Sequence, residues 1–308
     1  MKTKMAVVSH RKGNMISKPA DAVINIILML LSLICILPCI LVFIISITDE
    51  AVIIKNGYSF FPEKFAVLAY EYLLKPEGGI FRAYMVRIFV TVFGTCLSLI
   101  VVSMLAYALY RTDFKYRRVI SFLVFFTMLF SGGMVPWYLV CTQILHLKNT
   151  IWALILPMVM SSWNVILMRT FFSSMIPMAL IDAAKIDGCS EIRTWWSIVL
   201  PLAKPAMGTI ALFTALQYWN DWYLPLMLID DKKLYNLQYL LQKIQLNITM
   251  MASLASQSGG KLDTEIHALP SEGIRMAMCI FVIGPIVLAY PFFQRYLVKG
   301  ITIGSVKG

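Results

Sequence analysis

Long apolar runs constrain the fold of this chain more than any other feature of its sequence. Several of them reach about 20 residues or more, the length that an α-helix needs to cross the hydrocarbon core of a bilayer. The chain of 308 residues is 59% hydrophobic and only 14% charged, with a mean hydropathy of +0.77. A soluble domain of this length needs a more polar exterior, so the sequence predicts an all-α membrane protein.

The first apolar run, residues 23–47, is too long for the core of a signal peptide and lacks a small-residue cleavage site. We therefore expect it to be retained as a transmembrane helix. Together the runs predict six transmembrane helices, at residues 22–47, 83–110, 117–141, 150–174, 205–229 and 275–298. They form one transmembrane domain, residues 22–298, which follows an N-terminal segment, residues 1–21, and precedes a short tail, residues 299–308.

The charges of the connecting segments predict how these helices are oriented. When the segments alternate between the two sides of the membrane, one side receives 16 basic and five acidic residues, which is the whole net charge of +11. The other side has 11 residues of each sign. An excess of Lys and Arg marks the cytoplasmic side, so both termini are expected in the cytoplasm. The positive charge is then a topology signal that meets lipid headgroups, and no nucleic-acid partner is expected.

Two segments on the opposite side are long, at residues 48–82 and 230–274. Loops of this length in a compact domain are usually functional or disordered. The first segment is rich in aromatic residues, and the second includes a Ser/Gly-rich piece at residues 253–260. We expect an external docking surface on these two segments, with a flexible excursion as the alternative.

The segment 176–205 is charged, although it lies between predicted membrane helices. Pro177 suits the first turn of a helix, where its missing N–H is not needed. Residues 178–187 then predict two to three helical turns, which Gly188 ends by taking a positive φ. Ala183 and Ala184 have small side chains that would let the backbone of another protein come close. An amphipathic helix that lies at the membrane surface without a protein partner is the alternative.

The spacing within this segment resembles the cytoplasmic EAA loop of binding-protein-dependent ABC importers, on which the permease subunits seat an ATPase. Three residues separate the Asp182-Ala183-Ala184 sequence from Gly188, and nine more separate Gly188 from Ile198. The family pattern has Glu in place of Asp182, and Ala is commoner in place of Cys189. The resemblance implies the type I ABC importer permease fold with a cytoplasmic coupling helix. It also implies a set of ATPase-coupling residues: Pro177, Asp182, Ala183, Ala184, Asp187, Gly188, Leu200 and Pro201.

Further resemblance covers most of the chain. The Trp219-Asn220-Asp221 sequence and the stretch at 169–172 look like those of carbohydrate-importer permeases. The sequences at 130–136, 290–300 and 303–308 are narrower signals and resemble the LplB/YtcP-type permeases, whose substrates are typically oligosaccharides or glycan fragments. The resemblance implies a bacterial plasma-membrane protein that pairs with a second homologous permease, two ABC ATPase subunits and an extracellular substrate-binding protein.

Polar residues within membrane helices are costly and mark candidate functional positions. Amides and aromatic rings together suit a sugar, because the rings stack on its faces and the amides pair with its hydroxyl groups. Helix–helix hydrogen bonding and an interfacial aromatic belt remain the alternative, and the paired permease could carry most contacts with the substrate. The candidate substrate pathway consists of Asn164, Tyr218, Trp219, Asn220, Asp221 and Trp222.

The sequence contains no phosphate-binding loop of the form G-x-x-x-x-G-K-[ST]. ATP and Mg²⁺ are therefore expected in a partner ATPase, and no cofactor or metal is expected on this chain. Its His and Cys residues are not spaced as metal ligands, and we identify no catalytic residues. An ion-coupled secondary carrier is the main alternative function, for which Asp221 is the one plausible ion-coupling residue. A membrane enzyme or scaffold is a second alternative.

Overall fold

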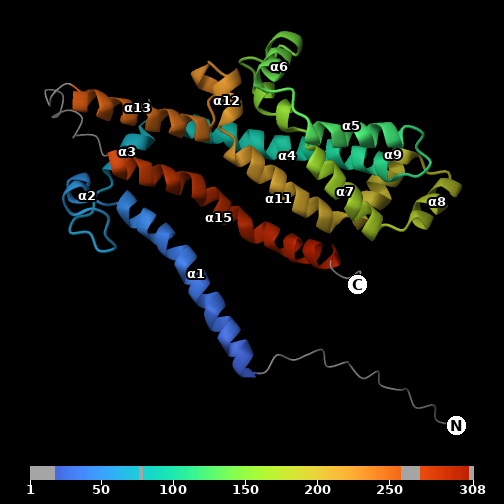
Figure 1. Ribbon diagram of the computed structural model, residues 1–308, viewed down its shortest axis with the longest axis horizontal. Coiled ribbons are helices and arrows are strands. Elements are labelled where there is room, and N and C mark those ends of the chain that lie inside the picture. The colour runs from blue at the N-terminus through green and yellow to red at the C-terminus, as the bar shows by residue number, and fades with distance from the viewer. Residues whose placement is uncertain (1–17, 76–78, 258–270, 305–308) are drawn as a thin grey trace.

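The computed structural model describes residues 18–75, 79–257 and 271–304, which fold into helices joined by loops (Figure 1). Three continuous helices in these ranges are long and apolar enough to cross a membrane, over Pro19–Ser46, Ile80–Tyr110 and Glu272–Pro291. They belong to α1 (Lys18–Ser46), α4 (Ile80–Tyr110) and α15 (Ser271–Gly304). These helices correspond to the first, second and sixth predicted transmembrane helices.

Three bent pairs of helices in the described ranges are also long and apolar enough to span a bilayer. The bend is 118° between α5 (Arg117–Leu129) and Met134–Ile144, and 51° between Ile151–Met158 and α7 (Ser162–Met175). It is 85° between Glu191–Leu202 and α11 (Lys204–Asn220). Counting each bent pair as one span brings the number of candidate spans to the predicted six.

Shorter elements connect these helices or build the bent pairs. They are α2 (Glu50–Asn56), α3 (Leu68–Leu74), α6 (Met134–Leu139), η2 (Val140–Ile144), η3 (Ile151–Leu154), η4 (Leu156–Met158), α8 (Met178–Ile186), α9 (Glu191–Thr194), η5 (Trp195–Val199), α10 (Leu200–Leu202), α12 (Tyr223–Leu228) and η6 (Lys232–Leu234). A further helix, α13 (Leu237–Gln257), precedes α15.

The predicted spans at 117–141, 150–174 and 205–229 are each interrupted by a break and do not form one continuous helix. Gly133 takes a φ of 85° between α5 and α6, a conformation that glycine adopts at little cost. Pro157 lies in the tight 3₁₀ turn η4, before α7 begins. In the predicted span 205–229, α11 stops at Asn220, and α12 then projects from the side of the bundle (Figure 1).

The long segment 230–274 contains a helix that the sequence analysis did not predict. Its apolar residues Leu237, Leu241, Ile244 and Ile248 recur at helical spacing, and they pack on α3, α4 and α15. The Ser/Gly-rich piece begins within the last turns of α13, and its remainder at 258–260 lies outside the described residues. The segment 48–82 likewise contains two short helices, α2 and α3.

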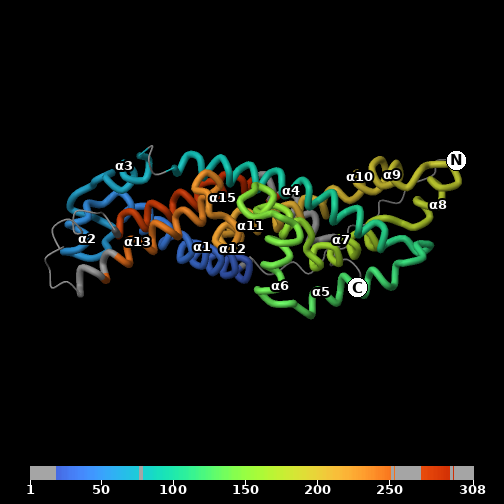
Figure 2. The backbone as a smooth tube through the Cα atoms, turned by 90° about the horizontal axis from the view of Figure 1, so that it is seen from above, coloured from blue at the N-terminus to red at the C-terminus, as the bar shows by residue number. Residues whose placement is uncertain are grey.

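The helices form an elongated bundle with two distinct ends. Figures 1 and 2 both show α8 and α9 at one end, which we call the α8 end, and α2 and α3 at the other, which we call the α3 end. α4 runs along the bundle between these ends and packs against α7, α11 and α13. α1 contacts α15 but diverges from the bundle toward its own N-terminus (Figure 1).

Three clusters of buried side chains hold the bundle together, and α4 contributes to each of them. The first lies toward the α8 end and includes Val102, Ala106, Met168, Phe172, Val199 and Ile210. The second joins α4 to the bent segments and includes Val90, Leu154, Tyr218, Leu228 and Tyr235. The third lies toward the α3 end and includes Leu73, Ile80, Trp219, Leu237, Ile274 and Ala277.

Gly94 lets α4 and α11 approach each other closely. A Cβ atom at this position would lie 2.6 Å from the ring of Tyr218, well inside the contact distance of carbon atoms. The ring has little room to move, because Tyr218 is fully buried and its hydroxyl donates to the carbonyl of Ile155 at 2.8 Å. Small residues allow such close packing between membrane helices.

We expect Gly94→Ala to lower the free energy of unfolding by about 1–3 kcal/mol, because the added methyl group overpacks the contact with Tyr218. Gly284→Ala is the matched control, since Gly284 is also helical and a Cβ there would meet no atom within 4 Å. Thermal unfolding of both variants in detergent, followed by tryptophan fluorescence, makes the comparison. Equal melting temperatures for Gly94→Ala and the unsubstituted chain would contradict the argument.

Candidate functional site

The predicted helix in the segment 176–205 is α8, and its ends have the predicted geometry. Pro177 has extended backbone immediately before the first helical residue, Met178. At the other end, Gly188 takes a φ of 78° and its N–H donates to the carbonyl of Lys185 at 3.1 Å. Glycine therefore ends the helix as expected for a left-handed C-terminal cap.

The buried and exposed faces of α8 differ in side-chain size and polarity. Ile181 and Ala184 are both buried, and Ile181 belongs to the first core cluster. The exposed face carries Asp182 and Ala183, followed by Asp187 at the end of the helix. Further along the segment, Leu200 packs against the first core cluster, whereas Pro201 is exposed. The exposed surface of α8 therefore combines two acidic residues and a small one with the basic Lys185 and the apolar Leu180 and Ile186.

A network of charges fastens α8 and α9 to the end of α4. Arg111, which is buried, donates two hydrogen bonds to the Asp113 carboxylate, at 2.8 and 2.5 Å. Lys185 of α8 pairs with the same carboxylate at 2.8 Å, and Glu191 of α9 pairs with Arg111 at 3.2 Å. The Tyr107 hydroxyl of α4 donates to Glu191 at 2.7 Å.

Sequence reasoning missed this network, because Arg111, Asp113, Lys185 and Glu191 were counted only as charges that orient the membrane helices. Their pairing depends on the folding of α8 back toward the loop after α4. A bidentate arginine–carboxylate pair fixes geometry better than a lysine pair does. The network therefore joins α8 and α9 to the residues that follow α4.

Hydrogen bonds from Arg111 and Lys185 hold the pKa of the Asp113 carboxyl group well below its usual value of 3.8. Because the pKa is lower in the folded than in the unfolded chain, the carboxylate stabilises the fold at pH values above 3.8. This contribution is lost only as the pH falls through the lower, folded-state pKa. The network is therefore expected to stay paired throughout the neutral range.

Asp113→Asn is expected to loosen α8 without unfolding the bundle, because it removes the charge that Arg111 and Lys185 share. The pairs are partly exposed, so their loss is expected to lower the free energy of opening of α8 by only about 1 kcal/mol. Amide hydrogen exchange in α8 should then accelerate by roughly fivefold. Hydrogen exchange followed by mass spectrometry measures this effect. Lys115→Gln, in the same loop but outside the network, is the control, and equal exchange in the two variants would contradict the proposed fastening.

The second group of candidate residues lies where α11 stops. The freed carbonyl of Trp219 accepts hydrogen bonds from Arg87 Nε at 2.7 Å, from Arg87 Nη2, and from Gln238 Nε2 at 3.0 Å. The Asp221 carboxylate accepts from the N–H groups of Tyr223 and Leu224 at 3.1 and 3.2 Å. Polar groups freed by a helix break within a membrane protein need such partners.

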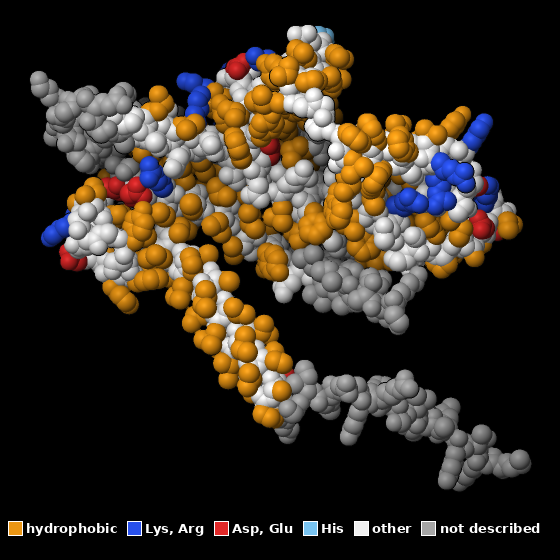
Figure 3. Space-filling model, viewed as in Figure 1, with side chains coloured by type: hydrophobic (Ala, Val, Ile, Leu, Met, Phe, Trp, Pro, Cys, Tyr) orange, Lys and Arg blue, Asp and Glu red, His pale blue; other side chains and the backbone are white. Residues whose placement is uncertain are grey.

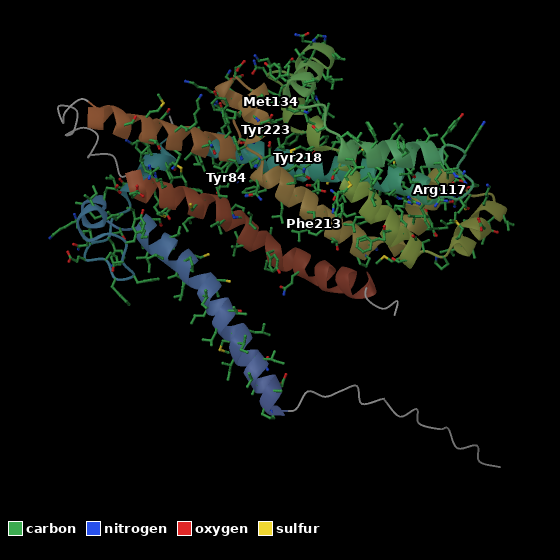
Figure 4. The ribbon with its side chains drawn as sticks, viewed as in Figure 1. Tyr84, Arg117, Met134, Phe213, Tyr218 and Tyr223 are labelled. Carbon is green, nitrogen blue, oxygen red and sulfur yellow. The ribbon has the colours of Figure 1, made fainter. Side chains whose placement is uncertain are left out.

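The break opens a cavity of about 450 Å³ beside α11 and α12. Three of the candidate pathway residues line it, namely Asn220, Asp221 and Trp222. The other lining residues are Met158, Phe213, Leu216, Gln217 and Tyr223. Figure 4 shows Phe213 on α11 and Tyr223 toward α12, with Tyr218 between the helices. The cavity therefore combines amides, one carboxylate and aromatic rings.

The remaining candidate pathway residues lie in the core and do not line this cavity. Tyr218 is fully buried, and the indole N–H of Trp219 donates to the carbonyl of Val282 at 3.1 Å. The Asn164 amide donates to the hydroxyl of Thr214 at 3.3 Å, which is a bond between α7 and α11. For these three residues, the structure favours the alternative role in helix packing. For Tyr218 and Trp219, the periodicity of α11 is the sequence signal that separates them from the lining residues Phe213, Leu216, Gln217 and Asn220.

Comparison with known proteins identifies the class. Residues 11–303 match the family described as binding-protein-dependent transport system inner membrane component, and the chain belongs to this family. It is thus a multi-pass, helical permease subunit of the type I ABC importer fold, and a transport component rather than an enzyme. The family predicted from the segment 176–205 is confirmed, and nothing supports the ion-coupled secondary carrier.

Two proteins of Bacillus subtilis strain 168 are similar over most of their length. The chain is 40% identical to Protein LplC, over 89% of this chain and 90% of that protein. It is 38% identical to the polygalacturonan/rhamnogalacturonan transport system permease protein YtcP, over 94% and 98%. A solved bacterial ABC transporter involved in the import of the acidic polysaccharide alginate matches with a TM-score of 0.76 and 28% identity, over 92% of this chain and 100% of that one.

Proposed function

We propose that this chain is the membrane-spanning permease subunit of an ATP-driven importer whose cargo is an oligosaccharide or glycan fragment. The observation that carries the proposal is α8, which presents a small exposed face and is fastened by ion pairs to α4. Membership of the family supports this role. Relatives named for transport of polygalacturonan, rhamnogalacturonan and arabinooligosaccharides support carbohydrate as the cargo.

In the proposed orientation the α8 end faces the cytoplasm and the α3 end faces outward, with both termini cytoplasmic. Lys and Arg side chains gather at the α8 end in Figure 3, in keeping with the positive-inside rule. The pathway cavity then lies toward the outer part of the membrane, where Arg87 contacts the end of α11. An external substrate-binding protein would dock at the α3 end, on the segments 48–82 and 230–274.

The partners follow from the surfaces that the chain leaves uncovered. None of the apolar window of α1 is buried within the chain, and Figure 3 shows hydrophobic side chains along its length. We assign this surface to lipid and to a second, homologous permease. Two ABC ATPase subunits, which hold ATP and Mg²⁺, would complete the transporter, with one of them seated on α8.

Coupling in this proposal is mechanical. The ATPase would contact Asp182, Ala183 and Asp187 on α8, with Pro177, Gly188, Leu200 and Pro201 fixing the ends of the segment and Ala184 its inner face. A displacement of α8 reaches α4 through Lys185, Asp113 and Arg111. α4 contacts the break in α11 through Arg87, so a rigid-body movement can open or close the cavity there.

Ala183→Asp is expected to abolish most of the oligosaccharide uptake while the chain remains in the membrane, because a bulkier charge blocks close approach of the ATPase to α8. Ala183→Ser, which adds only one oxygen atom, is the control and should retain transport. Affinity purification of each variant with identification of the bound polypeptides gives a second measurement. Normal uptake and normal recovery of the ATPase with Ala183→Asp would refute the assignment of α8.

Trp222→Ala is expected to reduce uptake by roughly 10-fold or more, because it removes an exposed ring from the pathway cavity while leaving the core intact. Trp222→Phe keeps an aromatic face and should retain much of the activity. Uptake of a labelled oligosaccharide into cells or proteoliposomes distinguishes them. If the Ala variant transports as well as the Phe variant, the cavity does not contact the cargo.

A further inference from the structure

A second and larger cavity, of about 960 Å³, lies toward the α3 end. It is enclosed by the end of α3, the first turns of α4, η6, α13 and one residue of α15, Phe281. Its volume falls in the range of small-molecule binding sites. Neither the coupling role of α8 nor the pathway cavity beside α12 accounts for it.

The described residues that line this outer cavity carry charge of one sign only. Four basic residues line it, namely Lys75, Arg82, Lys232 and Lys243, and none of the described lining residues is acidic. This contrasts with the side of the membrane to which these residues are assigned, where basic and acidic residues are equal in number. Within the described ranges, none of the four side chains forms an ion pair.

Three carboxylates in the described part of the chain, next to the elements that form this cavity, have partners of their own. Asp230 pairs with Lys148 at 3.0 Å, and Asp231 accepts a hydrogen bond from the backbone N–H of Lys233 at 2.9 Å. Glu272 pairs with Arg275 at 2.7 Å. The positive charges of the outer cavity are therefore not neutralised by these neighbours, and an anionic ligand would gain from all of them.

Lys243 is held in position toward this cavity. Its ammonium group donates to the Tyr235 hydroxyl at 3.0 Å and lies 4.7 Å from the centre of the Tyr235 ring. The hydrogen bond from Lys243 raises the pKa of its ammonium group, which therefore remains charged at neutral pH. The ammonium group has further N–H donors that can bind a carboxylate.

Aromatic side chains complete the lining. Phe81, Tyr84, Tyr235 and Phe281 line the same cavity, together with the amide of Asn247. The rings of Tyr84 and Phe281 lie 6.0 Å apart, and the Tyr84 hydroxyl donates to the Phe281 carbonyl, so this wall is held in place. Flat rings, an amide and unpaired cations together suit a sugar that carries carboxylate groups.

The outer cavity is also joined to the break in α11. Asn236, just before α13, donates to the carbonyl of Asp221 at 3.1 Å. Gln238, within α13, donates to the carbonyl of Trp219 at 3.0 Å. The helix that forms one wall of the outer cavity therefore also contacts the end of α11. A ligand at the outer cavity is placed to influence, or to move on to, the inner one.

We propose that the outer cavity binds an acidic oligosaccharide, a chain of uronate sugars, as it leaves the external binding protein and before it enters the pathway. This inference rests on the proposed function and narrows its cargo. An acidic surface of the binding protein could also meet the four cations. The aromatic rings within a concave site favour a sugar as the ligand. Carboxylates on a protein surface would need only exposed positive charges to bind, without rings or a cavity.

The test uses the complete transporter in proteoliposomes with its binding protein. Galacturonate trisaccharide is the acidic probe, and the same trisaccharide with its carboxyl groups reduced to alcohols is the neutral one. In Arg82→Gln and Lys243→Gln, KM for the acidic probe is expected to rise by roughly tenfold, because each variant loses one charge-assisted hydrogen bond to the sugar carboxylate. Transport of the neutral probe should change little. Lys55→Gln, on α2 and outside the cavity, is the control.

Equal losses for the acidic and neutral probes would overturn the inference, because the residues would then have a structural role. A weaker association of the binding protein with the transporter, with no selective effect on the acidic probe, would assign the cavity to protein docking instead. Transport of neutral but not acidic oligosaccharides by the unsubstituted complex would overturn the inference and leave the proposed function standing. Transport of neither, with no ATPase bound to the complex, would refute the proposed function itself.

Discussion

The break in α11 depends on a single physical requirement, that no backbone polar group be left without a partner inside a membrane protein. α11 ends at Asn220, and the carbonyl of Trp219 would otherwise be unpaired. The buried guanidinium group of Arg87 satisfies it from α4, and the Gln238 amide satisfies it from α13. The side chain of Asp221 then accepts the first N–H groups of α12. These contacts allow a non-helical segment to line a cavity in the bundle.

α4 joins this break to the other end of the molecule. It is 31 residues long, carries Arg87 near its first residues, and has Tyr107 in its last turn. Arg111 directly follows it and pairs with both Asp113 and Glu191. Because α4 is continuous, it forms a rigid element between its two ends. The chain therefore has a physical connection from α8 to the break in α11, without a contiguous series of side chains along the way.

The sequence predicted the parts of this structure that depend on local chemistry. Pro177 and Gly188 fix the ends of α8 through backbone conformation alone, and both ends were correct. The bend after α5 depends on Gly133 but also on tertiary packing. The apolar run at 117–141 therefore predicted a single span without this bend. Arg87 was missed because its role depends on a carbonyl that is 132 residues away in sequence. α13 has a clear helical period, but it was overlooked because its hydropathy is too low for a membrane span.

The two cavities differ in charge in a way that bears on transport. The outer one has four cations and no described acidic residue, whereas the inner one has the carboxylate of Asp221 and no basic residue among its lining. Arg87 is close to the inner cavity, but it is buried, and its Nε and Nη2 groups donate to the Trp219 carbonyl. An acidic sugar held by the outer cations would thus meet weaker electrostatic attraction further along. Transport requires binding strong enough for entry and weak enough for release, and along the proposed pathway a decrease in positive charge would provide both.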